Sequence, residues 1–137
     1  MKLPHLDQLV PLERGEAWLL ARAVQVLVDD VYKAERPVPA LEVLMTLPLA
    51  ALLRNLVLRH QRELLRPPKA PKPGKRPKRP KPQVFRVSYD QLAALHVQRL
   101  ALFHGGALSE QENRQLQGVV GKFHRESLNL DQRIRFA

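Results

Sequence analysis

Residues 67–82 read PPKAPKPGKRPKRPKP and divide the chain into two parts. This stretch holds seven prolines and seven Lys or Arg in sixteen positions, with no acidic residue and no apolar side chain larger than Ala70. It has too little apolar surface to offset the entropy of ordering, and its prolines lack the amide donors that a helix or a central strand needs. The sequence therefore predicts an extended linker that spans roughly 50 Å in a polyproline II conformation.

The linker also carries most of the net charge. Of the formal net charge of +10, it supplies +7, because residues 1–66 hold nine basic and eight acidic groups and residues 83–137 hold seven and five. Closely spaced cations suit the phosphates of a nucleic acid or an acidic protein surface. The alternative is a solvated linker whose charges prevent aggregation, and the absence of aromatic residues from it argues against base stacking. The predicted binding residues are Lys69, Lys72, Lys75, Arg76, Lys78, Arg79 and Lys81.

Residues 1–66 are expected to form a helical lobe. Pro11 can open a helix that runs to about Glu35, and a short helix over 40–45 should be followed by a break at 46–48 and a longer helix to Leu65. A short helix, a turn and a longer helix can form a helix-turn-helix DNA reader, although any small helical bundle contains such a corner. Five arginines could add a basic face to the linker: Arg54, Arg59, Arg62, Arg133 and Arg135.

Residues 83–137 are expected to form a second small lobe with two helices and two strands. The first strand covers 84–89, and two capping boxes, at 88–91 and 109–112, open the helices that follow it. Residues 128–136 alternate between apolar and polar, which predicts a C-terminal strand. That strand should pair with 84–88 in a two-stranded ribbon, or else add to the sheet of a partner. The fold class is therefore mainly α, and the two lobes, 1–66 and 83–137, should pack together as one unit that the linker 67–82 connects.

The residues that enzymes and metal sites require do not form a recognisable pattern. There is no cysteine, and the five histidines lack metal-ligand spacing. No phosphate-binding loop, dinucleotide fingerprint or nucleophile motif occurs, so we expect no enzyme activity, no metal and no cofactor. The apolar window that covers residues 40–58 contains Glu42, Pro48 and Arg54, which argues against a bilayer span. A cytoplasmic location, the host cytoplasm if a phage encodes the chain, is the expectation.

In general build the chain resembles the small accessory proteins of thermophile phages that bind host RNA polymerase. The resemblance lies in its size, its Arg- and Leu-rich composition and its helical lobes with a basic connector, and it implies a regulatory protein whose partners are RNA polymerase subunits. Two alternatives stay open at this point. The chain could bind DNA or RNA directly through its basic residues, or it could be a structural or packaging protein of a virion.

Overall fold

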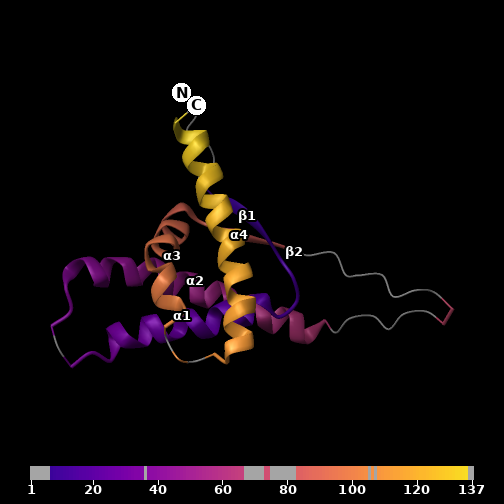
Figure 1. The fold of residues 1–137 in the computed structure, drawn as a ribbon, viewed down its shortest axis with the longest axis horizontal. Helices are drawn as coiled ribbons and strands as arrows, with labels where there is room; N and C mark the ends of the chain where they lie inside the picture. The colour runs from indigo at the N-terminus through magenta and orange to yellow at the C-terminus, as the bar shows by residue number, and fades with distance from the viewer. Residues whose placement is uncertain are drawn as a thin grey trace.

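The computed structural model describes residues 7–35, 37–66, 73–74, 83–104, 106 and 108–135. Within them the chain forms strand β1 (Gln8–Leu12), helices α1 (Glu16–Tyr32) and α2 (Ala40–Leu65), strand β2 (Gln83–Val87), and helices α3 (Tyr89–Leu102) and α4 (Glu110–Arg135). The two strands pair antiparallel as a two-stranded sheet. The expectation of a mainly helical protein with a small β ribbon is confirmed (Figure 1).

The two strands of the β ribbon are not the two that the sequence predicted. β2 lies where the sequence predicted a strand, but it pairs with β1, with Val10 opposite Phe85. The prediction that Pro11 opens a helix is wrong, because the alternating burial of Gln8, Val10 and Leu12 gives this segment a strand period. A proline is tolerated in an edge strand, since an outward-facing position needs no amide donor.

The first helix begins later than the sequence suggested. α1 follows Gly15, whose φ of 87° lies in the left-handed region that glycine enters without strain. The carboxylate of Glu16 accepts a hydrogen bond from the Glu13 amide at 2.6 Å, which supports the turn into the helix. The buried face of α1 is rich in alanine and leucine and packs mainly against α2.

α2 is one continuous helix, so the predicted break at 46–48 is wrong. Pro48 lies inside it, where the missing amide hydrogen leaves the Leu44 carbonyl without its usual donor. Two residues before Pro48, the Thr46 hydroxyl donates to the Glu42 carbonyl at 2.6 Å. Burial of Leu49 and Leu52 on the core side offsets the local loss. Because no turn divides the helix, the short-helix, turn and longer-helix arrangement of a helix-turn-helix reader is absent from residues 40–65.

Both predicted capping boxes are present. The Ser88 amide donates to Gln91 Oε1 at 3.3 Å at the start of α3. At the start of α4 the Ser109 amide donates to Glu112 Oε1 at 3.1 Å, and the Glu112 amide donates to the Ser109 hydroxyl at 3.2 Å. Each box satisfies amides that the first helical turn leaves without an internal partner. The sequence therefore placed the start of both helices correctly.

The predicted C-terminal strand is wrong, because α4 continues to Arg135. Of the apolar side chains assigned to one face of that strand, Leu130 is buried, whereas Leu128 and Ile134 are exposed. Leu116, Phe123 and Leu130 follow one another at seven-residue spacing, which is the period of a helix face. The predicted strand position of Phe136 lies outside the described residues.

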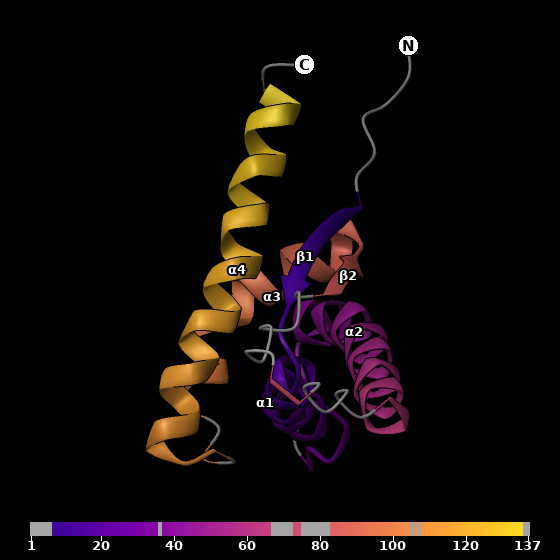
Figure 2. The ribbon, with the colours of Figure 1, turned by 90° about the vertical axis from the view of Figure 1, so that its right-hand side faces the viewer.

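One hydrophobic core joins elements that precede and follow residues 67–82. It includes Val10, Leu20 and Leu52 from the first part of the chain and Leu95 and Phe123 from the second. Figure 2 shows the two-stranded sheet between two helices, with α4 on the side of β1 and α2 on the side of β2. The outer edge of β2 therefore faces α2, which positions the groove described below.

Candidate functional site

The seven predicted binding residues of the linker lie outside the described residues: Lys69, Lys72, Lys75, Arg76, Lys78, Arg79 and Lys81. Their role stays a prediction. The described residues place the two ends of this stretch, since α2 ends at Leu65 and β2 begins at Gln83. The basic stretch therefore connects α2 directly to β2.

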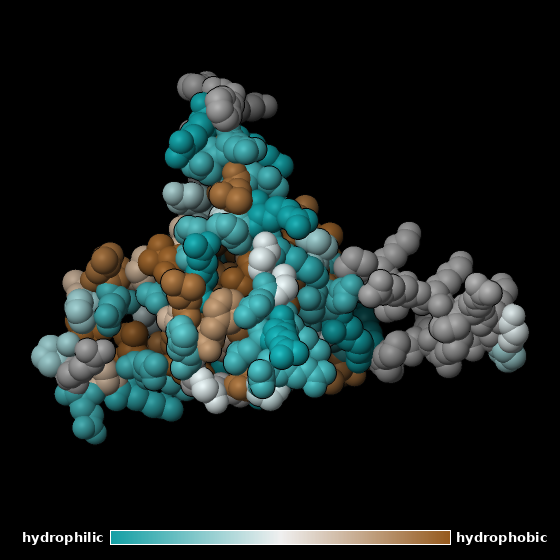
Figure 3. Space-filling model, in the orientation of Figure 1, coloured by the Kyte–Doolittle hydropathy of each residue, from teal (hydrophilic) through white to brown (hydrophobic). Residues whose placement is uncertain are grey.

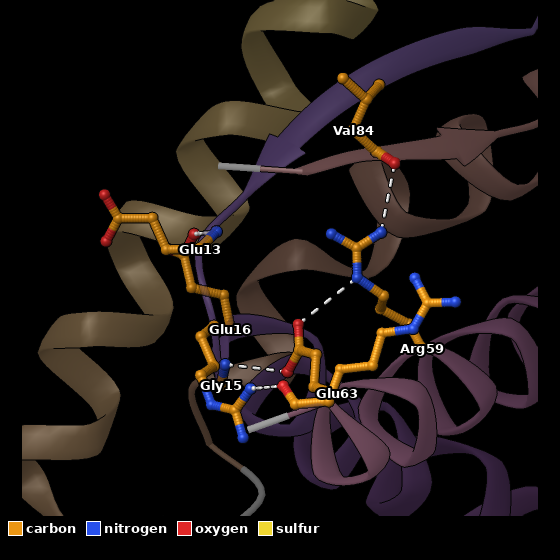
Figure 4. Close-up of polar contacts among 8 residues, drawn as sticks. Glu13, Gly15, Glu16, Arg59, Glu63 and Val84 are labelled. Carbon is orange, nitrogen blue, oxygen red and sulfur yellow. Dashed lines mark hydrogen bonds and ion pairs between the residues drawn. The ribbon is translucent and has the colours of Figure 1, made fainter. Parts of the chain in front are cut away.

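Arg59 ties α2 to β2. Its side chain is only 12% exposed; Nε donates to Glu63 Oε1 at 3.4 Å, and Nη1 donates to the Val84 carbonyl at 3.2 Å (Figure 4). Glu63 in turn accepts a hydrogen bond from the Gly15 amide at 3.1 Å. Arg59 is thus engaged in holding the fold, unlike the solvent-facing arginine that the sequence suggested.

Arg54 and Arg62 are exposed on the same helix. Arg62 and Arg86 line an open groove of about 410 Å³ between α2 and β2, and Arg54 lies outside that lining. The groove brings together a predicted residue, Arg62, with one that the sequence analysis did not select, Arg86. No sequence signal pairs them, because they lie on opposite sides of the linker.

Arg133 and Arg135 belong to the last turn of α4. Arg133 Nη1 donates to Gln8 Oε1 at 3.4 Å, and Arg135 Nε donates to Asp131 Oδ1 at 3.2 Å. Figures 1 and 2 both place the end of α4 away from α2. These two arginines are therefore separate from the arginines of α2, and the five do not form one cluster.

An exposed apolar surface covers the first turns of α2 and the adjacent helix α3. In Figure 3, brown side chains gather over the N-terminal part of α2 and over α3. Single exposed apolar residues are common, but a cluster of this kind marks an interaction site. We define the apolar surface by its exposed members: Leu41, Val43, Leu44 and Leu47 on α2, and Val97 and Leu100 on α3.

The sequence analysis did not single out these side chains of α2. The missed signal is that residues 40–53 are apolar on nearly all sides of the helix. A helix in a protein of this size buries one face, represented here by Leu49 and Leu52, so the opposite face of Leu44 and Leu47 has to face solvent or a partner.

By length and composition, α2 is apolar enough to cross a membrane. Its most apolar window has a mean hydropathy of 1.7, and 22% of that window is buried. The sequence analysis took three residues of this helix as evidence against a bilayer span: Glu42, Pro48 and Arg54. By this measure of length and composition, they do not exclude a span. In the folded chain the same helix supplies Leu52 and Leu56 to the core, and both are fully buried. The helix therefore combines a core face with a second apolar face.

A histidine pair links α3 to α4. The rings of His96 and His124 stack with centroids 5.1 Å apart and an interplanar angle of 6°, and their Nδ1 atoms are 3.2 Å apart. Nη1 of Arg99 lies 3.2 Å from the same Nδ1 of His124. The same Nη1 lies 3.5 Å from His124 Nε2, so the Arg99 guanidinium, which can only donate, contacts both nitrogens of that ring.

This pair predicts that acid destabilises the fold. Partial desolvation of the ring, together with the charges of Arg99 and His124, lowers the pKa of His96 below its ordinary value of 6.5. As the pH falls through 6.5, the unfolded chain binds the proton first, so the free energy of unfolding should fall and level off only below the folded-state pKa. Urea unfolding at a series of pH values should give a flatter profile for His96→Gln than for the unchanged protein.

The matched control for the histidine pair is His104→Gln, which replaces an exposed histidine beyond the end of α3. It should keep the acid dependence of the unchanged protein. Equal flattening by both variants would contradict the assignment to His96.

Among the residues that the structure describes, no group of three or more His, Asp or Glu side chains could hold a metal ion. His60 stacks on Trp18 with ring centroids 4.7 Å apart, and His5 lies outside the described residues.

Comparison with known proteins does not place the chain in a family. No family model, no curated protein and no solved structure matches it. Its function has to be inferred from the surfaces of the molecule itself.

Proposed function

We propose that this protein is a non-catalytic regulator that docks on transcription machinery, with RNA polymerase subunits as its partner. The apolar surface of α2 and α3 makes the protein contact. The basic linker touches nucleic acid or an acidic face of the same assembly and strengthens the docking.

The observation that carries the proposal is the exposure of large apolar side chains on α2 and α3, two helices that contact each other. Leu44 is 63% exposed, Leu47 is 55% exposed and Leu100 is 67% exposed. Burying such side chains against a partner stabilises a complex by about 25 cal/mol per Å² of apolar area removed from water, before the costs of association. A central apolar patch surrounded by charged residues is the usual anatomy of a protein interface.

The charge distribution supports a nucleoprotein target in particular. Residues 67–82 supply +7 of the +10 net charge, while the parts on either side are close to neutral. A concentrated cation stretch increases the rate of encounter with a polyanion and makes affinity depend on salt, but it gives little specificity. Specificity then comes from the apolar surface, which is why a machine that contains both protein and nucleic acid fits better than nucleic acid alone.

A pull-down from nuclease-treated host lysate tests the proposal. The tagged full chain should recover RNA polymerase subunits, and the double variant Leu44→Glu with Leu47→Glu should recover at least about tenfold less, since two charges would enter an apolar contact. Leu128→Glu is the matched control, because Leu128 is 52% exposed on α4, outside the apolar surface. It should recover polymerase like the unchanged chain.

Three outcomes would overturn the proposal. Recovery of nothing would remove polymerase as the partner. Loss of all binding after nuclease treatment would favour the direct nucleic-acid binder, for which the exposed Arg54 and Arg62 are the supporting observation. Recovery of capsid components in place of polymerase would favour the virion protein.

A further inference from the structure

The sheet has one edge that can accept another strand. A proline nitrogen carries no hydrogen, so the Pro11–Val84 pair fits the ladder as a pair without mutual hydrogen bonds. The ladder bonds then belong to the pairs on either side of it, Val10–Phe85 and Leu12–Gln83. On β1, Pro11 presents no amide donor at the outer edge, which blocks strand addition on that side.

On β2 the same alternation turns the main-chain groups of Val84 and Arg86 outward, toward α2. Arg59 occupies one of them by donating to the Val84 carbonyl. The Val84 amide and both the amide and carbonyl of Arg86 have no hydrogen-bond partner among the described residues. Two donors and one acceptor are therefore available at the edge of a strand.

These groups lie along the groove between β2 and α2 defined above. On the strand side Val84 is 53% exposed, and on the helix side Leu58 is 45% exposed, so each wall offers apolar contact. Asn55 adds a side-chain amide to the helix wall. The groove thus offers main-chain hydrogen bonds along one wall and side-chain contacts along the other, which is how proteins bind extended peptides.

The charges of the groove select an acidic occupant. Its lining contains three arginines, Arg59, Arg62 and Arg86, and one carboxylate, Asp7. Asp7 is paired with Arg86 at 2.8 Å, and Arg59 is paired with Glu63, which leaves exposed Arg62 with no ion-pair partner among the described residues. Along the chain, the basic stretch of 67–82 connects the two elements that form these walls.

We propose that this groove binds an extended, acidic segment of a partner protein, which adds to β2 as a third strand. Carboxylates of the segment pair with Arg62, the exposed arginine of the helix wall. A nucleic acid is the weaker fit, because its phosphates offer no donor for the Arg86 carbonyl, which would face them as a second acceptor. This site lies apart from the apolar surface, and its occupant need not belong to RNA polymerase.

The test uses the full chain and a fluorescent peptide of alternating glutamate and valine. Fluorescence anisotropy at low salt should detect binding, and Arg62→Glu should weaken it at least about tenfold, because an attraction is replaced by a repulsion. Arg54→Glu is the matched control, since it makes the same charge change at an exposed position of α2 outside the groove. It should weaken binding much less.

Two further variants separate strand pairing from charge attraction. A peptide methylated on alternate backbone nitrogens keeps every carboxylate but loses the donors that face β2, so it should bind at least about tenfold more weakly. Val84→Pro removes an outward amide of β2 without touching the ladder to β1, and it should weaken the unmethylated peptide while circular dichroism confirms the fold.

The proposal is overturned if the acidic peptide does not bind, or if it binds equally with and without backbone methylation. It is also overturned if a single-stranded oligonucleotide of equal charge binds more tightly and loses affinity in Arg62→Glu. None of these results depends on polymerase capture, so the groove and the proposed function can fail separately.

Discussion

Phe123→Ala should lower the free energy of unfolding by about 3–5 kcal/mol, which is the usual effect of replacing a buried phenylalanine by alanine. Phe123 is 1% exposed and sits on α4 with its ring 6.3 Å from that of Phe85 on β2, at an interplanar angle of 63°. The substitution removes this edge-to-face contact and leaves a cavity between α4 and the ribbon. Since small domains are stable by about 5–15 kcal/mol, the loss would be a large share of the total.

Urea unfolding followed by circular dichroism measures the effect of Phe123→Ala. Leu128→Ala is the control, because Leu128 lies on the same helix and is 52% exposed; it should change the free energy by no more than about 0.5 kcal/mol. Similar losses in the two variants would contradict the placement of Phe123 in the core. A reduced slope against urea, in contrast, would indicate a loosened native state.

The helices that begin with local side-chain signals could be predicted from the sequence. Ser88 with Gln91 and Ser109 with Glu112 set the starts of α3 and α4 through contacts three residues apart, and these need no knowledge of the rest of the chain. The apolar period of α1 is equally local. Where the determining contact spans a few residues, the sequence was sufficient.

The errors arose where distant contacts decide the conformation. Pro48 favours a break, yet burial of Leu49 and Leu52 beside α1 keeps α2 continuous. Residues 128–134 alternate between apolar and polar like a strand. They nevertheless belong to α4, because Leu130 continues the buried helix face of Leu116 and Phe123. Pattern over a short window cannot distinguish these cases, because the packing partner is absent from the window.

The residues of the candidate sites divide in the same way, into those that local sequence could predict and those that only distant contacts bring together. Exposed Arg54 and Arg62 could be selected by their position opposite the apolar face of the helix, whereas Arg59 is engaged with Val84, a residue across the linker. The groove and the His96–His124 pair each join residues from two elements, so only the fold brings them together. The cations of 67–82 remain the strongest feature of the sequence, and their role depends on a partner.

Deleting residues 1–12 should abolish cooperative unfolding, although the sequence alone assigned the partner strand to the other end of the chain. The deletion removes β1, whose Val10 and Leu12 are 0% and 1% exposed. Burial of these two side chains alone contributes about 3–6 kcal/mol, which approaches the whole stability of a small domain. It also leaves β2 as a lone strand and uncovers Phe85 and Val87, and a lone strand is not stable in water.

Deleting residues 131–137 is the matched control, since 131–135 are exposed at the end of α4 and their loss removes the hydrogen bond from Arg133 to Gln8 but no described core side chain. Circular dichroism during heating should therefore show a broad, non-cooperative change for the N-terminal deletion and a sharp transition near that of the full chain for the C-terminal one. The two strand assignments predict opposite results, because pairing of 128–136 with 84–88 would make the C-terminal deletion the damaging one. A sharp transition in the N-terminal deletion would mean that β1 is dispensable and that the ribbon does not hold α2 and α4 together.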